Sequence, residues 1–423
     1  MRRTCALLNV VLASIASATP PVGDFCADVR DYLPDGHVTD GSIDYKIQIQ
    51  KCFDENACVH FPGSDDPDRP MVYGITAEAV GKVLRTRPHA RIRFRPNSVL
   101  KRLPSFGDLL WLEPGAHLLG AIIDGNKYAH WPLVKDRTQF NIGNAVVMAG
   151  QNLVKDCFVY NNAGTAFTPW RSNDNKLYRC RAENGGFLEA IGKLDYWGAG
   201  KANGDGFYTR GRFNLVKDSE MIDTSRWGYV ITSGGRDNTF VDCRGGNLHF
   251  RCYGFIDVEG AGPGNSLVRC RSPNSQLIVQ VHHQDVIGCT ADTIVAEHAI
   301  YARLLACTTV GGPMRAAEVR DDRFVMPGRE SPMVAANRVF LGGPARDHSL
   351  TVICSDGLGT VTENVVYGGR DGDDRSTEML LYGVPVRRGN QQTWGSWDTQ
   401  IDQFAEPYYL RGRLDMEFKQ KFQ

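Results

Sequence analysis

The middle of the chain repeats a short pattern in which an asparagine precedes alternating apolar and polar residues and then a small residue. The pattern spans Asn152–Cys157, Asn175–Cys180, Asn214–Ser219, Asn238–Cys243 and Asn265–Cys270, with shorter relatives at Asp285–Cys289 and Arg303–Cys307. Successive cysteine or serine positions lie 23, 39, 24, 27, 19 and 18 residues apart. A period of about twenty residues is typical of a solenoid.

Each repeat unit is interpreted as turn, strand, turn, strand. The asparagine suits a left-handed turn position, the following residues alternate as in a half-buried strand, and the cysteine or serine points inward and stacks on its equivalent. A second strand begins near a glycine, as at Gly206, Gly228 and Gly254. No helical pattern separates these short strands, so βαβ units are excluded. We therefore predict an all-β, single-stranded parallel β-helix over residues 64–395.

The two ends follow other patterns. Residues 43–53 place Ile43, Ile47 and Phe53 on one side of a short amphipathic helix, which we expect to cap the N-terminal end of the solenoid. We assign residues 19–63 to this cap and a first strand that begins at Val59. Residues 91–95 also alternate as a strand should, and residues 396–423 are expected to form a C-terminal tail or cap.

The first eighteen residues have the features of a signal peptide. Arg2 and Arg3 precede an apolar stretch, and Ala16-Ser17-Ala18 is a small-residue cleavage site. We therefore expect a protein secreted to the extracellular space or the periplasm. No later apolar run approaches the ~20 residues that a membrane helix needs, so no membrane partner is expected after cleavage.

Charge and cysteine content narrow the function classes. The 423 residues contain 48 Lys and Arg and 48 Asp and Glu, so the net charge is zero and a nucleic-acid partner is not expected. Of twelve cysteines, eleven remain after cleavage, so at least one thiol is unpaired within the chain. Cys52 and Cys58 bracket a short loop and are a candidate disulfide pair. The repeat cysteines act as small apolar residues. No zinc-type spacing occurs, and neither a metal site nor a cofactor is expected.

The N-terminal segments resemble the start of pectate-lyase-like β-helix proteins. Gly36-His-Val-Thr-Asp40 is followed by Ile47-Gln-Ile-Gln50 and by Val59-His-Phe-Pro-Gly63. In that superfamily a Gly-x-x-x-Asp segment precedes an Ile-Gln helix and a strand that ends in Phe-Pro-x-Gly. Phage tailspikes, rhamnogalacturonases and polysaccharide lyases share this opening. The resemblance implies a right-handed parallel β-helix and a polysaccharide partner.

A second, local resemblance involves residues 205–210. Asp205-Gly-Phe-Tyr-Thr-Arg210 is similar in shape and position to the active strand of alginate C5-epimerases. Arg210 stands where that family has a histidine, and no aspartate follows it. The Asn-Thr-Asp and Gly-His-Gly patterns of polygalacturonases do not occur.

The 39-residue interval contains an insertion of about fifteen residues, Glu189 to Asn203. Loops that protrude from a regular scaffold commonly carry function, and aromatic rings stack on the apolar faces of sugars. The insertion is therefore a candidate wall of a substrate groove. Its candidate substrate-binding residues, together with Arg226 on the next coil, are Lys193, Asp195, Tyr196, Trp197 and Lys201.

Candidate catalytic residues follow the insertion. If Phe207 and Thr209 face inward, Tyr208 and Arg210 share the outer face. Elimination from a uronic acid needs a cation at the carboxylate, for which Arg210 and Arg236 are candidates. It also needs a base, for which Tyr208 and His249 are candidates.

Hydrolysis needs two carboxyl groups instead. Asp205 with Asp257 or Glu259 would supply them if their strand positions match and if Ile256 and Val258 face inward. A third possibility is a non-catalytic glycan-binding or adhesion solenoid. Because cations and Tyr or His outnumber carboxylates near the insertion, we expect a secreted enzyme that cleaves an acidic polysaccharide, with β-elimination favoured over hydrolysis.

Overall fold

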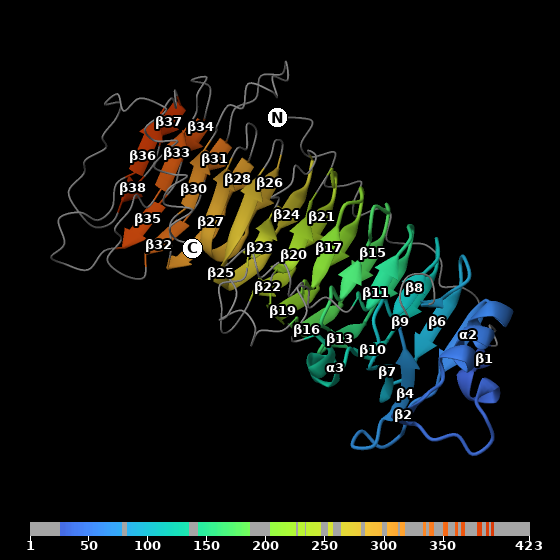
Figure 1. The fold of residues 1–423 in the computed structure, drawn as a ribbon. Helices are drawn as coiled ribbons and strands as arrows, with labels where there is room; N and C mark the ends of the chain where they lie inside the picture. Colours follow the sequence, from blue (N-terminus) through green and yellow to red (C-terminus); the bar gives the residue numbers. More distant parts are fainter. Residues whose placement is uncertain are drawn as a thin grey trace.

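The structure is a computed structural model that describes most of the chain between residues 26 and 392. The described residues are 26–77, 83–134, 143–186, 204–225, 227–232, 234–246, 253–256, 264–280, 284–297, 303–311, 314–317, 333–335, 338–341, 350–353, 360–362, 365–368, 379–382, 386–388 and 391–392. Within these ranges every strand pairing is parallel, and the strands stack along one axis (Figure 1). The chain is therefore a parallel β-helix, as predicted.

Each complete coil contributes three strands, one to each of three faces. Face 1 is a 14-stranded sheet. Its strands are β1 (Ala27–Asp28), β3 (Cys58–Phe61), β6 (Arg91–Phe94), β9 (His117–Leu119), β12 (Leu153–Lys155), β15 (Lys176–Tyr178), β18 (Leu215–Lys217), β21 (Thr239–Val241), β24 (Ser266–Val268), β26 (Asp285–Ile287), β28 (Arg303–Leu305), β31 (Met333–Ala335), β34 (Thr360–Thr362) and β37 (Val386–Arg388).

Face 2 follows face 1 after a short corner that we call corner 1–2. Its strands are β2 (Asp40–Asp44), β4 (Met71–Thr76), β7 (Ser98–Leu103), β10 (Ile122–Asp124), β13 (Phe158–Tyr160), β16 (Arg181–Gly185), β19 (Glu220–Thr224), β22 (Arg244–Gly246), the first parts of β25 (Arg271–Gln280) and β27 (Thr290–Glu297), β29 (Thr308–Gly311), β32 (Arg338–Leu341), β35 (Val365–Gly368) and β38 (Gln391–Gln392).

Face 3 closes the coil and leads through corner 3–1 into the next strand of face 1. Its strands are β5 (Leu84–Arg85), β8 (Leu110–Leu112), β11 (Val146–Met148), β14 (Phe167–Thr168), β17 (Phe207–Thr209), β20 (Trp227–Ile231), β23 (Tyr253–Ile256), the second parts of β25 and β27, β30 (Met314–Ala317), β33 (Leu350–Ile353) and β36 (Met379–Tyr382). Faces 2 and 3 form one 24-stranded sheet because β25 and β27 run through both.

The prediction of two strands per unit was wrong, because the residues after the cysteine form a strand of their own. Phe158–Tyr160 of β13, for example, follows Cys157 directly. Three residues are too few for an alternation to be recognised in the sequence. The strands that begin near glycines belong to face 3, and Gly206 precedes β17.

The interior consists of columns of equivalent residues from successive coils. On face 1 one column runs through Val59, Ile92, Leu118, Val154, Leu177, Val216, Phe240, Leu267, Val286 and Leu304, all of them buried. Burying such side chains stabilises the fold by about 1.5–3 kcal/mol each. Because every coil repeats the arrangement, each one covers the apolar interior of its neighbour.

The repeat asparagines are buried in corner 3–1 and form a ladder along the axis. The backbone N–H and side-chain Nδ2 of Asn175 both donate to Oδ1 of Asn214, at 3.1 and 2.8 Å. Asn214 donates to Asn238 in the same way, and Asn238 donates to Asn265. The prediction that these asparagines take left-handed conformations was wrong. The residue before each of them has the positive φ instead, for example Asp174 (61°) and Phe213 (57°).

The prediction of an inward cysteine column is confirmed. Cys157, Cys180, Cys243 and Cys270 are each at most 2% exposed, as is Ser219 in line with them, and the four thiols form no disulfides. Burial raises the pKa of Cys180 and Cys270 well above the ordinary thiol value. These groups therefore stay protonated and inert, because the thiolate is the reactive form.

A capping helix lies at the N-terminal end, although its bounds and its apolar face differ from the prediction. Helix α2 spans Lys46–Glu55, because β2 occupies the residues up to Asp44. Its buried residues are Ile49, Cys52 and Phe53, and the Phe53 ring meets Phe61 of β3 edge-on, with 6.2 Å between centroids. Ile43 and Ile47, which were predicted to face the solenoid, are 43% and 80% exposed.

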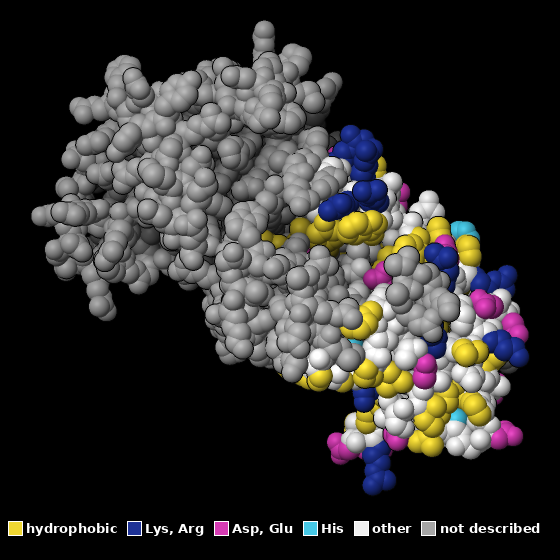
Figure 2. Space-filling model, in the orientation of Figure 1, with side chains coloured by type: hydrophobic (Ala, Val, Ile, Leu, Met, Phe, Trp, Pro, Cys, Tyr) yellow, Lys and Arg dark blue, Asp and Glu magenta, His cyan; other side chains and the backbone are white. Residues whose placement is uncertain are grey.

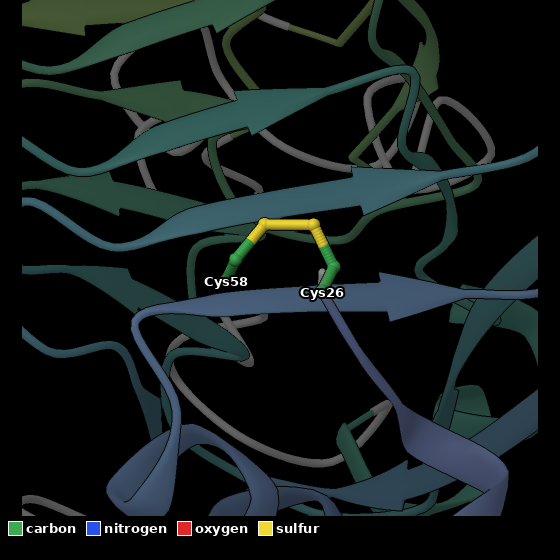
Figure 3. Close-up of a disulfide and its surroundings, with 2 residues drawn as sticks. All are labelled: Cys26 and Cys58. Carbon is green, nitrogen blue, oxygen red and sulfur yellow. A yellow bond between two sulfur atoms is a disulfide. The ribbon is translucent and has the colours of Figure 1, made fainter. Parts of the chain in front are cut away.

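The disulfide also differs from the expected pair. Cys58 bonds to Cys26, which precedes β1 (Figure 3), and Cys52 is a buried free thiol in α2. The side chain of Cys52 belongs to the helical face that packs on the solenoid. Cys26 instead lies beside Cys58 because β1 pairs in parallel with β3. The short loop between Cys52 and Cys58 was therefore a misleading signal.

Two short helices complete the described elements, η1 (Val29–Tyr32) and α3 (Lys127–Val134). Helix α3 lies between faces 2 and 3, in the corner that we call corner 2–3. In the described part of the chain, no helix has the length and hydropathy needed to cross a membrane.

Candidate functional site

An aromatic and cationic cluster lies on the outside of face 3, at its junction with corner 3–1. Phe207 and Thr209 of β17 are fully buried, and Tyr208 between them is half-buried and faces outward. This alternation is the one that the sequence predicted. It places Tyr208 and Arg210 on the same outer face.

Trp170, Tyr208 and Arg210 form one contact group, which we call the aromatic shelf. The rings of Trp170 and Tyr208 stack with 5.7 Å between centroids and 17° between planes. The Arg210 guanidinium carbon lies 4.6 Å from the centroid of Trp170 and 5.7 Å from that of Tyr208. Its Nε donates a hydrogen bond of 2.9 Å to the Tyr208 hydroxyl. Two aromatic faces thus hold the cation over the sheet.

The shelf lies beside solvent. Trp170 is 44% exposed although it is a large apolar residue. Figure 2 shows a band of hydrophobic side chains beside Lys and Arg side chains, over the part of the molecule where Figure 1 places β17. An exposed ring next to a guanidinium offers a flat apolar surface for a sugar and a planar donor group for a carboxylate.

The sequence analysis did not identify Trp170 as a site residue, although the repeat would have placed it next to Arg210. Phe167 and Phe207 are paired in register, so a residue three positions after each takes an equivalent place. Those residues are Trp170 and Arg210, which stack on each other in the folded chain. Trp170 was overlooked because β14 is only two residues long.

Asp205 lies at the start of β17 but beneath the surface. It is 2% exposed, and its Oδ1 accepts a hydrogen bond of 3.2 Å from the backbone N–H of Trp227 on the next coil. A buried carboxylate bonded to the backbone fixes how β20 follows β17. The position of this carboxylate therefore differs from that of Tyr208 and Arg210.

The register of face 3 also bears on the proposed carboxylate pair. Tyr208 aligns with Val230, which aligns with Ile256. Trp227, which binds Asp205, aligns with Tyr253. The residue equivalent to Asp205 two coils later is therefore Tyr253, whereas Asp257 lies outside the described residues. Ile256 takes the register position of Tyr208.

Arg236 lies in corner 3–1, one coil after the shelf. It forms an isolated parallel bridge with Arg212, and its Nε is 3.7 Å from Oδ2 of Asp237. Arg236 therefore neighbours Arg212, two positions beyond Arg210, rather than Arg210 itself. The described structure places it beside the corner rather than on the shelf.

The insertion begins and ends next to the shelf strand. A Cβ on Gly204 would lie only 2.2 Å from the backbone nitrogen of Gly186, so the two glycines pack against each other. The Lys127 ammonium of α3 donates to the Gly186 carbonyl and to Oδ1 of Asn184, each at 2.6 Å. Lys127 is fully buried. These contacts fix the two chain ends from which the insertion leaves the coil.

Several candidate residues lie outside the described part of the chain. They are Lys193, Asp195, Tyr196, Trp197 and Lys201 of the insertion, and Arg226, His249, Asp257 and Glu259. The groups of three or more His, Cys, Asp or Glu side chains that would hold a metal ion do not occur among the described residues. Tyr208 and Arg210 are therefore the candidate residues that the described structure brings together, in the aromatic shelf.

Comparisons with known proteins identify the fold. No family model matches the chain, and no curated protein matches its sequence. Among solved structures, the A-module of a mannuronan C-5 epimerase from Azotobacter vinelandii superimposes with a TM-score of 0.52 and 16% identity, covering 87% of this chain and 100% of that one. A tailspike double mutant of E. coli bacteriophage HK620, in complex with a pentasaccharide, gives 0.50 and 10%, covering 90% and 68%. The chain has a right-handed parallel β-helix fold like that of these proteins.

Proposed function

We propose that the protein is a secreted enzyme that cleaves an acidic polysaccharide on face 3, with the aromatic shelf at the reacting sugar. The observation that carries this proposal is the Arg210 guanidinium, which lies over two rings and is bonded to a phenol. An aromatic surface binds a sugar ring, and a guanidinium binds a carboxylate. A uronic acid has both groups.

β-Elimination is the reaction that suits these groups. Arg210 would bind the uronate carboxylate and stabilise the negative charge that develops when the adjacent C5 proton leaves. Tyr208, as phenolate, would take that proton, because a hydrogen bond from a cation favours the charged form of the phenol. The C4–O bond then breaks, a C4=C5 double bond forms, and the departing oxygen takes a proton from water.

Two further observations support a saccharide ligand and secretion. Two fold neighbours with TM-scores of at least 0.50 are an epimerase of mannuronan and a tailspike in complex with a pentasaccharide, so saccharides are the first ligands to test. The Cys26–Cys58 disulfide suits an oxidising compartment. It supports secretion, to which the N-terminal signal pattern also points.

The test is a panel of acidic and neutral polysaccharides, with ultraviolet absorbance reporting unsaturated products and a reducing-end assay reporting any cleavage. Arg210→Ala should lower turnover about 10²–10³-fold, by analogy with the loss of one charge-stabilising donor. Its matched control is Arg181→Ala. Arg181 also lies over a ring, that of Phe158 at 5.4 Å, but on face 2. The control should retain full activity.

Other outcomes would redirect the proposal. Reducing ends without ultraviolet absorbance would favour a hydrolase. Saccharide binding without any product would favour a glycan-binding or adhesion solenoid. Full activity in Arg210→Ala would contradict the role of the shelf.

A further inference from the structure

Face 1 carries a second charged surface, which the aromatic shelf does not use. Each of five successive strands, from β6 to β18, has at least one basic side chain in an outward position. We call this set the basic strip, and its residues are Arg91, Arg93, His117, Lys155, Lys176 and Lys217. Neighbouring strands lie about 4.8 Å apart, so the strip extends about 20 Å along the solenoid axis.

The strip has a regular zigzag order. The register aligns His117, Leu153, Lys176 and Leu215 in one outward row. It aligns Leu119, Lys155, Tyr178 and Lys217 in the other. From β9 to β18 the basic residue therefore alternates between the two rows, and an apolar or aromatic residue takes the other position on each strand.

Acidic residues are missing from the outward positions of the strip among the described residues. From β3 to β21 the described outward positions of face 1 contain no Asp or Glu. The nearby Asp156 of corner 1–2 is engaged in a two-point contact with Arg179. Lys217 is 3.9 Å from Asp218, at the limit of an ion pair. Because the whole chain has no net charge, the strip is a local separation of charge rather than a general property.

The surface is also partly apolar and open. Leu119, Leu153, Tyr178 and Leu215 are half-buried, and Lys176 is exposed. Burial lowers the pKa of His117, and Arg91 and His89 lower it further. His117 is therefore mostly uncharged at neutral pH, and the Arg and Lys residues carry the positive charge of the strip.

We propose that the basic strip binds an anionic polysaccharide that runs across the strands, parallel to the solenoid axis. One pyranose ring is comparable in length to the strand spacing of about 4.8 Å, so one sugar would lie over each strand. In an extended β-1,4-linked polyuronide, successive carboxylates point to opposite sides, which matches the zigzag of basic residues. The leucines and Tyr178 would contact the apolar ring faces. This inference goes beyond the proposed cleavage, because it requires no reaction at the shelf.

The pattern favours this ligand over other polyanions. Single-stranded nucleic acids bind through several stacked aromatic rings, and the outward rows from β6 to β18 contain one, Tyr178. Membrane surfaces attract clustered basic residues without needing a particular spacing. A strand-by-strand alternation is a feature that only an ordered linear polymer would use.

The experiment measures binding of purified poly-β-1,4-mannuronate to the full chain at several salt concentrations, with neutral β-1,4-mannan as comparison. The triple variant Lys155→Gln/Lys176→Gln/Lys217→Gln should bind at least about tenfold more weakly, with a salt dependence flattened by up to about three in log–log slope. Replacing the same three lysines by arginine should retain binding. The matched control, Lys51→Gln/Arg69→Gln/Arg244→Gln, removes three exposed charges elsewhere. It should bind as the parent does.

Each alternative has its own result. Equal weakening by the control triple would mean non-specific attraction, and equal binding of neutral mannan would exclude recognition of charge. Tighter strip-dependent binding of single-stranded DNA or anionic vesicles would replace the polysaccharide with that partner. If Trp170→Ala removes all binding while the triple variant removes none, the strip is not a site. The proposal for the aromatic shelf is tested separately, because its failure would appear as absence of product in the polysaccharide panel.

Discussion

The two corners that flank face 1 both turn the chain from one strand to the next, but different contacts join their successive coils. Both contain a residue with positive φ on successive coils, such as Asp174 and Phe213 in corner 3–1 and Arg179 and Asp218 in corner 1–2. Corner 3–1 joins its coils through the buried asparagine ladder. Corner 1–2 joins them through exposed ion pairs, Asp156 with Arg179 and Asp242 with Arg269.

The difference shows how burial decides how much a contact contributes to the stability of the fold. A buried amide that loses its partner costs its full desolvation penalty, about 1–3 kcal/mol. An exposed ion pair competes with water and contributes about 0.2–1 kcal/mol. Corner 1–2 compensates on its inner side, where the cysteine column packs directly behind the exposed charges. The asparagine ladder and the cysteine column should therefore set the stability of the solenoid.

The largest expected effect is that of Asn214→Leu. Oδ1 of Asn214 accepts two hydrogen bonds from Asn175, and its Nδ2 donates to Asn238. The substitution leaves the buried N–H of Asn175 without a partner and leaves the Asn175 amide only its bond to Ser172. We therefore expect a loss of about 2–4 kcal/mol in the free energy of unfolding, measured by urea denaturation. The control is Asn173→Ala in the same corner, whose exposed Oδ1 accepts one bond from Arg212. A loss below that of the control would contradict the ladder's importance.

The next effect tests the inner side of corner 1–2. Cys243→Leu adds volume to a packed column and should cost about 1–3 kcal/mol through overpacking. Cys243→Ser should cost less, because Ser219 holds the equivalent place and its hydroxyl donates to the Lys217 carbonyl at 2.9 Å. Thermal unfolding monitored by circular dichroism compares the two variants. If the leucine variant were as stable as the serine variant, the column would not be tightly packed.

The smallest effect is expected for Arg269→Ala on the outer side of corner 1–2. Arg269 donates two hydrogen bonds of 2.7 Å to Asp242, but its side chain is 59% exposed. We expect a loss of about 0.2–1 kcal/mol at neutral pH. The hydrogen bonds from Arg269 also lower the pKa of Asp242 below its ordinary 3.8.

The sign of this pKa shift fixes how the effect of Arg269→Ala depends on pH. A carboxyl whose pKa is lower in the folded state stabilises the fold above pH 3.8 and loses that contribution as the pH falls through the folded value. The difference between Arg269→Ala and the parent should therefore shrink below about pH 4. The Asn214→Leu penalty should persist there, because amides do not titrate. Urea denaturation at pH 7 and pH 3 measures both, and a constant Arg269 difference would exclude this ion-pair contribution.

The sequence predicted the structural features that recur in every coil. The spacing of the asparagines and cysteines indicated a parallel solenoid and an inward cysteine column, and the alternation around Phe207 placed Tyr208 and Arg210 on one outer face. These features depend on residue order within a single coil, and the same order recurs along the chain. Local physics was therefore enough to identify them.

The tertiary structure decided everything that depends on which coils lie side by side. It joined Cys58 to Cys26 instead of Cys52 and turned the asparagines from turn residues into a ladder. It also brought Trp170 onto Tyr208 and buried Asp205 beneath the surface of the same strand. Such contacts depend on the number of residues between equivalent positions, and corners of variable length change that number from coil to coil. The sequence by itself determined the structure of a single coil, and only the stacking of coils determined which side chains meet on the surfaces of the solenoid.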